Sequence, residues 1–157
     1  MAEVSNQTTE MAEREIVISR RLDAPRDLVW RAWTEPEHLI RWWGPDGFTN
    51  TFHEVDFRTG GVWRFIMHGP DGTDYNNYVR LIEVVRPERM VYDQGTSADD
   101  IWHSSRVTFE EADGGTLVTL KVTFPTVEAR NAAVEHFNAI EAGNQTLGRL
   151  AEYLETM

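Results

Sequence analysis

The feature that most constrains this chain is a long amphipathic stretch near its C-terminus, from Thr126 to Glu155. Apolar and small residues recur there at alternating steps of four and three, which places their side chains on one stripe of an α-helix. The stripe consists of Ala133, Phe137, Ile140, Asn144, Leu147, Ala151 and Leu154, widened by His136 and Leu150. At about 1.5 Å per residue the predicted helix is roughly 45 Å long, with Thr126 as its cap. A helix with one apolar stripe needs an apolar surface on which to pack.

The preceding part of the chain supplies that surface as a series of short strands. The predicted strands are Arg14–Leu22, Thr49–Arg58, Val62–His68, Asp74–Arg86, Arg89–Gln94, Trp102–Glu111 and Thr116–Phe124. Turn residues such as Gly60-Gly61 and Pro70-Asp71-Gly72 separate them. Connections of this length join antiparallel neighbours, because a parallel crossover needs about a dozen residues or more.

Two short helices are predicted between the first and second strands. Pro25 suits the first turn of a helix that runs to Thr34. Thr34-Glu35-Pro36-Glu37 has the form of a capping box, so a second helix should run from about Glu35 to Trp42. The sequence therefore predicts an α+β fold, with one curved antiparallel sheet around the long C-terminal helix and two short helices after the first strand. Residues 1–13 are polar and without period, and we expect a disordered lead-in to a single domain at 14–157.

Composition and charge exclude several classes of function. The absence of Cys rules out disulfides and thiolate chemistry and favours a reducing compartment. No apolar run approaches 18 residues, so we expect a cytoplasmic protein without membrane insertion. A net charge of −11 argues against nucleic acid as the partner. The five His show no HxxxH or HxH spacing, so neither a metal site nor a cofactor is predicted.

Strand alternation predicts which side chains face the long helix and enclose a candidate ligand-binding cavity. The apolar walls would be Trp63, Phe65, Met67, Val79 and Phe109 on the strands, with Phe137, Ile140 and Leu147 on the helix. The polar groups in phase with them are Asn77, His103, Ser105 and Asn144. Polar side chains inside an aromatic enclosure could orient a ligand.

The free-energy cost of an empty apolar cavity limits how this space can be occupied. At about 24 cal/mol per Å³, an empty apolar groove of roughly 300 Å³ would cost about 7 kcal/mol, which rivals the stability of a whole domain. The space must therefore be filled by the chain's own aromatic side chains, by water held on polar groups, or by a ligand. The residues alone leave these three possibilities open.

Three features have two interpretations each. Asn144 costs about 1 to 3 kcal/mol on an apolar stripe unless it is bonded, so it either pairs with the sheet, for example with Asn77, or contacts a ligand. The Trp42-Trp43-Gly44-Pro45 segment could gate a pocket, but packing of the helix pair against the sheet is favoured. His103 and Ser105 could be an acid-base and nucleophile pair, but a polar pocket wall is favoured, and no catalytic residue is predicted.

Several segments of the chain carry the pattern of a known family. They are Leu22-Asp23-Ala24-Pro25, Val29 to Leu39, Trp42-Trp43-Gly44-Pro45, Gly60 to Phe65, Gly69 to Gly72, Pro87 to Tyr92 and Gly143 to Leu154. In this order, over about residues 14 to 155, they resemble the bacterial relatives of the activator of heat-shock-protein-ninety ATPase. The resemblance implies a helix-grip fold of the START-like type, in the polyketide-cyclase and lipid-transport superfamily, with a cavity between sheet and long helix. Many relatives carry Gly-Trp where this chain has Gly143-Asn144, which implies a more polar pocket here.

Three functional hypotheses follow from these observations. The first is a carrier, sensor or sequestration protein that binds a small hydrophobic or amphipathic molecule in the cavity between sheet and helix. The second is a protein-interaction or co-chaperone-like module that docks on a protein partner. The third and weaker one is an enzyme of cyclase or hydrolase type, for which the sequence offers no nameable nucleophile.

Overall fold

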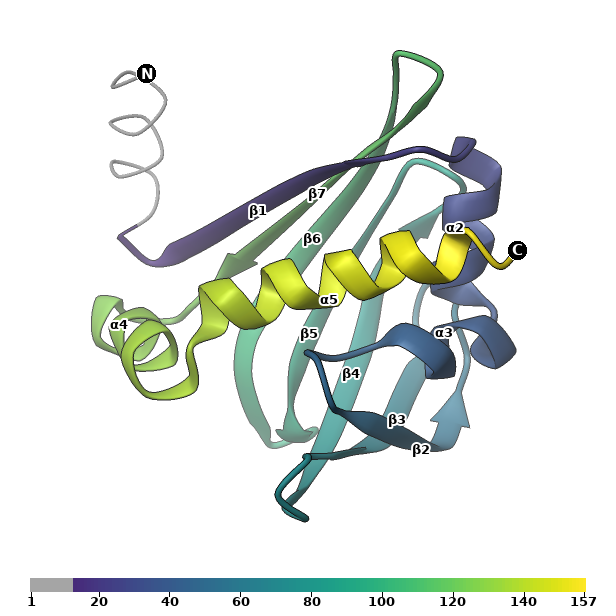
Figure 1. The fold of residues 1–157 in the computed structure, drawn as a ribbon. Coiled ribbons are helices and arrows are strands. Elements are labelled where there is room, and N and C mark those ends of the chain that lie inside the picture. Colours follow the sequence, from purple (N-terminus) through teal and green to yellow (C-terminus); the bar gives the residue numbers. More distant parts are fainter. Residues whose placement is uncertain (1–12) are drawn as a thin grey trace.

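The computed structural model describes residues 13–157, which form one sheet and four helices (Figure 1). The strands are β1 (Glu15–Leu22), β2 (Thr49–Val55), β3 (Val62–His68), β4 (Asp74–Val85), β5 (Arg89–Ser97), β6 (Asp100–Ala112) and β7 (Gly115–Thr123). The helices are α2 (Arg26–Thr34), α3 (Pro36–Trp42), α4 (Val127–Phe137) and α5 (Ala139–Leu154). Residues 1–12, most of the predicted lead-in, lie outside the described residues.

All neighbouring strands are antiparallel, as the short connections predict. The order across the sheet is β1-β7-β6-β5-β4-β3-β2, so the first strand pairs with the last. The predicted boundaries differ most at β2, which ends at Val55 rather than Arg58, and at β5, which continues to Ser97 rather than ending at Gln94. α5 crosses the concave side of the curved sheet (Figure 1). The predicted α+β helix-grip architecture is confirmed.

Irregular pairing accompanies the bend of the sheet. The register shifts between Phe52 and Glu54 in β2, between Leu81 and Glu83 in β4, and on both sides of Gly95 in β5. An extra residue in one strand of a pair increases the local twist and bends that strand. A side chain at Gly95 would overlap the carbonyl oxygen of Asp100, so a glycine is required at this irregular point of the β5–β6 pairing.

The prediction of one continuous helix over residues 126–155 is wrong at Asn138. This residue adopts a left-handed conformation with φ of 51°, and it ends α4 and precedes α5. Asn is among the few residues that tolerate this conformation, because its short polar side chain can bond locally. The predicted cap is confirmed, since the Thr126 side chain accepts a hydrogen bond from the Ala129 amide. α4 has no buried residue, so it contributes little to the core.

The predicted capping box at the start of α3 is also wrong. Thr34 donates its hydroxyl to the carbonyl of Trp30, 2.8 Å away, because it closes α2 instead of opening α3. Glu35 occupies the N-cap position of α3 without a side-chain cap bond, and Pro36 begins the helix. The fixed φ of Pro is already helical, which allows α3 to start without the box.

Aromatic side chains fill the core between the two short helices and the sheet. Ring contacts run from Trp30 through Phe109 and Trp33 to Trp42 and Trp43, with centroids 5.0 to 5.8 Å apart. Trp43 continues the contacts to Trp63, which stacks on Phe65 at 4.1 Å. Most of these contacts are edge-to-face, the arrangement that the aromatic quadrupole favours. Trp42 and Trp43 are buried, so the prediction that they pack the helix pair on the sheet is confirmed.

α5 is fastened to the sheet and to the loop after α3. Leu147, Leu150 and Leu154 are buried beneath it. Nη1 of Arg149 donates to the carbonyls of Gly44 and Pro45 at 2.9 and 2.8 Å. These contacts hold the second half of the helix in place.

Candidate functional site

The structure brings five of the predicted cavity walls together in the interior. Trp63, Phe65, Val79, Phe109 and Leu147 are each 0–1% exposed and belong to one core cluster. Their predicted inward orientation is confirmed. They pack with the indole rings of the two short helices, so aromatic side chains occupy the space beneath the second half of α5. Met67 is half-buried at the margin of this cluster.

The inward orientation predicted for Phe137, Ile140 and Asn144 is wrong. Phe137 is 73% exposed, Ile140 is 41% exposed, and Asn144 is exposed as well. The left-handed residue Asn138 separates Phe137, at the end of α4, from the stripe of α5. Within α5 the buried face runs through Leu147, Leu150 and Leu154, and Ile140 and Asn144 lie to one side of it. Asn144 donates its amide to the Ile140 carbonyl within α5 at 3.1 Å, instead of pairing with Asn77.

Polar side chains gather on the concave face of β4, β5 and β6. Asn77 accepts a hydrogen bond from the Gln94 amide at 2.9 Å, and Gln94 lies opposite His103 in the β5–β6 register. Tyr92 and Ser105 form the next opposed pair on the same face. We call these five residues the concave polar cluster. Asn77, Tyr92 and Ser105 are buried, whereas Gln94 and His103 are half-buried and form its accessible margin.

His103 is the electrostatically unusual member of the concave polar cluster. Burial lowers the pKa of its imidazole from 6.5 to about 4, because desolvation disfavours the charged ring more than nearby Asp93 favours it. The ring is therefore neutral at pH 7. Its Nδ1 atom is buried and has no hydrogen-bond partner among the described residues, and its ring packs edge-on against Phe124 at 5.3 Å. An unpaired buried nitrogen is costly, so this position favours a bound polar group.

Tyr92 adds a second uncharged polar group. Burial raises the pKa of its phenol to about 12, and a hydrogen bond with Ser105 partly offsets that rise. The concave polar cluster therefore consists of amides, hydroxyls and a neutral imidazole at pH 7. It offers hydrogen bonds without formal charge.

Sequence reasoning missed Gln94 and Tyr92. The signal was present, because Met90, Tyr92 and Gln94 alternate along β5 and Met90 and Tyr92 are buried. The sequence does not reveal the register between neighbouring strands, and the cluster depends on Asn77 meeting Gln94 across β4 and β5. Among the predicted polar groups, Asn77, His103 and Ser105 are brought together, and Asn144 is not.

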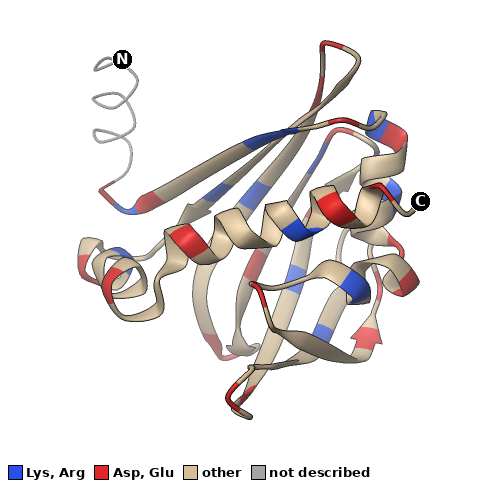
Figure 2. Cartoon of the chain, viewed as in Figure 1, with Lys and Arg blue, Asp and Glu red and all other residues tan. Residues whose placement is uncertain are grey.

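Two surface depressions lie on the opposite, convex face of the sheet. The larger has a volume of about 360 Å³ and is lined by His53, Arg64, Phe65, Ile66, Asn76, Asn77 and Thr96. The smaller, of about 200 Å³, is lined by Val91, Ser104, Ser105, Arg106, Lys121 and Thr123. Figure 2 shows basic and acidic residues interspersed over strands and helices. On the convex face many of them are paired, for example Arg64 with Glu54 and Arg80 with Asp93.

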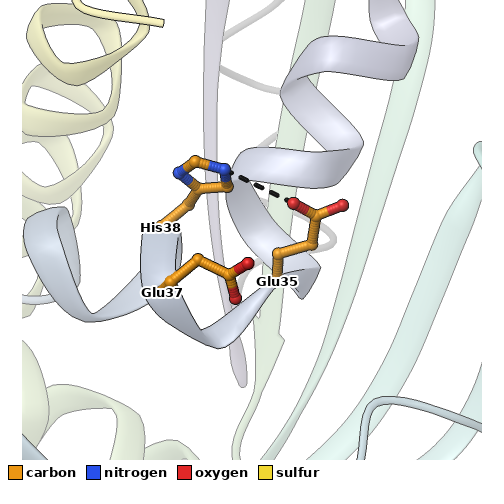
Figure 3. Close-up of side chains that lie close together, drawn as sticks. All are labelled: Glu35, Glu37 and His38. Atoms are coloured by element: carbon orange, nitrogen blue, oxygen red, sulfur yellow. Dashed lines mark ion pairs between the residues drawn. The ribbon is translucent and has the colours of Figure 1, made fainter.

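One group of side chains could offer three ligand atoms to a metal ion. Glu35, Glu37 and His38 at the start of α3 place one such atom each within 4.8 Å of the others (Figure 3). Both His38 nitrogens already have partners, with Nδ1 2.6 Å from the Tyr153 hydroxyl and Nε2 3.4 Å from Glu35. Glu35 also pairs with Arg31 at 3.1 Å. These contacts join α2, α3 and α5 and account for the cluster without an ion.

The architecture defines the class of this protein. A curved antiparallel sheet that holds a C-terminal helix on its concave side, with two short helices after the first strand, is a helix-grip fold of the START-like type. Within residues 13–157, every helix is too short or too polar to span a lipid bilayer. A family model described as "Activator of Hsp90 ATPase homolog 1-like protein" matches residues 23–155. The chain belongs to this family.

Solved structures of bacterial proteins share the fold over nearly the whole chain. A protein from Nitrosomonas europaea is 26% identical, with a TM-score of 0.83, covering 92% of this chain and 96% of that one. A protein from Mycobacterium smegmatis is 27% identical, with a TM-score of 0.84, covering 92% of each chain. An AHSA1-like protein from Aeromonas hydrophila, 22% identical with a TM-score of 0.69 over 90% of this chain and 92% of that one, is alike in fold. A comparison with curated proteins found no match.

Proposed function

We propose that the protein binds a small, mostly apolar and uncharged molecule on the concave face, at the accessible margin of the concave polar cluster. The observation that carries the proposal is His103, a half-buried and neutral imidazole whose Nδ1 has no partner within residues 13–157. Such a group lacks one hydrogen bond that a ligand hydroxyl or carbonyl can supply. This binding role is that of a carrier, sensor or sequestration protein in the cytoplasm.

The surroundings of His103 define the ligand further. The phenyl ring of Phe124 covers one side of the imidazole, and Val122 lies opposite Ser105 in the neighbouring strand. Apolar walls with a few fixed polar groups are typical of sites that bind small molecules. Because the concave polar cluster carries no formal charge at pH 7, it favours a neutral ligand over an anion or a cation.

The position of the site differs from the enclosed chamber that the sequence predicts. Aromatic rings fill the interior beneath the second half of α5, so the ligand would lie towards the first half, beside His103 and Phe124. An apolar ligand that packs on Phe124 there would gain about 25 cal/mol per Å² of apolar surface removed from water.

A thermal-shift screen against lipids, aromatic alcohols and ketones, and polyketide-like compounds tests the proposal. A binding compound should raise the melting temperature and shift the side-chain amide signals of Asn77 and Gln94 in an NMR spectrum. The proposal fails if no compound stabilises the protein, or if a stabilising compound leaves both amide signals unchanged.

Neighbouring residues on β4 provide a matched control. Asn77 faces the concave side and is 6% exposed, whereas Asn76 is exposed on the convex side. Asn77→Ala removes the partner of Gln94 and should weaken ligand binding about tenfold, the equivalent of one hydrogen bond of about 1.4 kcal/mol. Asn76→Ala should leave the affinity unchanged. Equal effects of the two substitutions would place the ligand elsewhere.

We infer a second candidate function, a protein-interaction module, from the apolar side chains at the junction of α4 and α5. Phe137 is 73% exposed and Ile140 is 41% exposed. Large apolar side chains exposed together can mark a protein-binding surface. A purified chaperone of the kind named by the family should then bind the wild-type chain in sedimentation experiments, and Phe137→Ser should abolish binding. Unchanged sedimentation of the mixture would reject this candidate.

A further inference from the structure

A hydroxyl, an imidazole and a carboxylate form a continuous relay on the convex face of the sheet. Thr51 Oγ1 in β2 lies 2.7 Å from Nε2 of His68 in β3. Nδ1 of the same imidazole lies 2.7 Å from Oδ1 of Asp74 in β4. Because a carboxylate only accepts hydrogen bonds, Nδ1 carries a proton, which leaves Nε2 of the Nδ1–H tautomer to accept from the Thr51 hydroxyl.

This arrangement has the geometry of an activated nucleophile. A hydroxyl within hydrogen-bond reach of a base, with that base oriented by a third group, is the pattern shared by unrelated hydrolases. The pattern is recognised by geometry and not by residue order, which is why the sequence alone does not show it. The sheet register explains the approach, because Thr51 pairs with Ile66, and His68 pairs with Asp74.

The relay lies beside the larger convex depression of about 360 Å³. Ile66, the direct partner of Thr51 in β2–β3, lines that depression together with Asn76 and His53. His53 is the extra residue where the register shifts between Phe52 and Glu54. Such bulges are frequent next to active sites, where they change the direction of side chains. The depression therefore offers an apolar contact and polar groups next to the hydroxyl.

β2, the strand that carries Thr51, also has backbone N–H groups that are free, within the described residues, to donate hydrogen bonds to a substrate. It is the last strand in the sheet order of the described residues, so alternate amides of β2 point away from β3. Backbone N–H groups are the usual donors that stabilise the oxyanion formed when a hydroxyl attacks a carbonyl.

We propose that Thr51, His68 and Asp74 hydrolyse activated esters of short-chain acids at the convex depression. Thr51 Oγ1 attacks the ester carbonyl carbon while its proton passes to His68 Nε2. The bond to the leaving alcohol breaks, and the alcohol takes that proton. Water then attacks the acyl-threonine, His68 accepts its proton and returns one to Thr51, and the carboxylic acid leaves. Asp74 acts as a positioning residue that holds the imidazole in the required tautomer.

Hydrolysis of p-nitrophenyl acetate and butyrate by the full chain tests the proposal. Thr51→Val and His68→Gln should each lower kcat/KM at least tenfold, and mass spectrometry of the quenched wild-type reaction should find the acyl group on Thr51. Thr49→Val is the matched control, because Thr49 lies on the same strand and makes no side-chain hydrogen bond to His68 within residues 13–157. The Thr49→Val protein should hydrolyse the esters at the wild-type rate.

The positioning role of Asp74 is tested by the tautomer of the His68 ring, which a purely structural role of Asp74 would not change. The ¹⁵N shifts of the His68 ring should show the Nδ1–H tautomer in the wild-type protein and a mixture of tautomers in Asp74→Asn, with lower kcat/KM. Wild-type hydrolysis by Thr51→Val, an acyl group on another residue, or an unchanged tautomer in Asp74→Asn would each overturn the proposal. Failure here leaves the concave site untouched, because the relay and the concave polar cluster lie on opposite faces of the sheet.

Discussion

Acidification should destabilise the protein through His103. In the folded chain the pKa of this imidazole is lowered to about 4, against an ordinary value of 6.5, because the ring is removed from water. Between these values the unfolded chain binds a proton that the folded chain does not. The free energy of unfolding therefore rises with pH over this window. The contribution of His103 is complete above pH 6.5 and is lost as the pH decreases towards 4.

The magnitude follows from the two pKa values. Between pH 7.5 and pH 5 the proton bound to the unfolded imidazole lowers the free energy of unfolding by about 2 kcal/mol, and below pH 4 the full difference is about 3 kcal/mol. Carboxylates titrate in the same range, so the wild-type curve alone does not isolate the effect. His103→Gln keeps a polar side chain without a titrating ring, and the difference between the two curves isolates His103.

Urea unfolding at pH 7.5 and pH 5 measures this difference. We expect wild-type stability to fall about 2 kcal/mol further than that of His103→Gln, since all other groups cancel. His53→Gln, at an exposed position on the convex side, is the matched control and should follow the wild-type curve. An NMR titration midpoint for the His103 ring near 6.5 would refute the reasoning, because the ring would then be solvated in the folded protein.

Three further predictions concern the packing that positions the site. A methyl group at Gly143 would overlap Cδ1 of Ile18, so Gly143→Ala should lower the free energy of unfolding by about 1 kcal/mol in the wild-type protein. Ile18→Val removes that Cδ1 atom, so in this background the higher helix propensity of Ala should raise the free energy of unfolding by about 0.5 to 1 kcal/mol. Urea unfolding of the four proteins measures both effects. Phe109→Ala should cost about 3 to 5 kcal/mol in the same assay, because the ring is fully buried between Trp30 and Trp33. Thr126→Ala should destabilise α4 locally by about 1 kcal/mol, which faster amide exchange in that helix would report.

The sheet was largely predictable from the sequence because alternation and turn chemistry are local properties. Trp63 and Phe65 alternate with Arg64 and Ile66, and the structure buries the aromatic pair. Short turns then impose antiparallel pairing from β2 to β7, whereas the pairing of β1 with β7 joins strands far apart in the chain and does not follow from a turn. The same local logic correctly assigned Thr126 as a cap, since a hydroxyl before a helix serves the free amides of its first turn.

The helix break and the cluster were not predictable in this way. The stripe from Ala133 to Leu154 keeps helical spacing through Asn138, so periodicity gives no sign of the left-handed residue that separates α4 from α5. Periodicity also does not show how α5 is rotated on the sheet: its buried face runs through Leu147, Leu150 and Leu154, so Asn144 lies beside that face and bonds within its own helix. Gln94 was missed for a related reason, because its role depends on contact with Asn77 across two strands. Both errors concern how elements meet in space.

The position of the break also determines how the space between sheet and helix is filled. After Asn138, α5 follows β1 closely at Gly143 and reaches the aromatic cluster at Leu147, so the second half of the helix is packed by the chain itself. Towards the first half, the sheet presents the amides of Asn77 and Gln94 and a His103 nitrogen that has no partner in the described part of the chain. An apolar space can be closed by packing alone, whereas unpaired polar groups require water or a ligand. The space beneath the second half of α5 is therefore closed by side-chain packing, whereas the polar space towards the first half is suited to bind and release a small ligand.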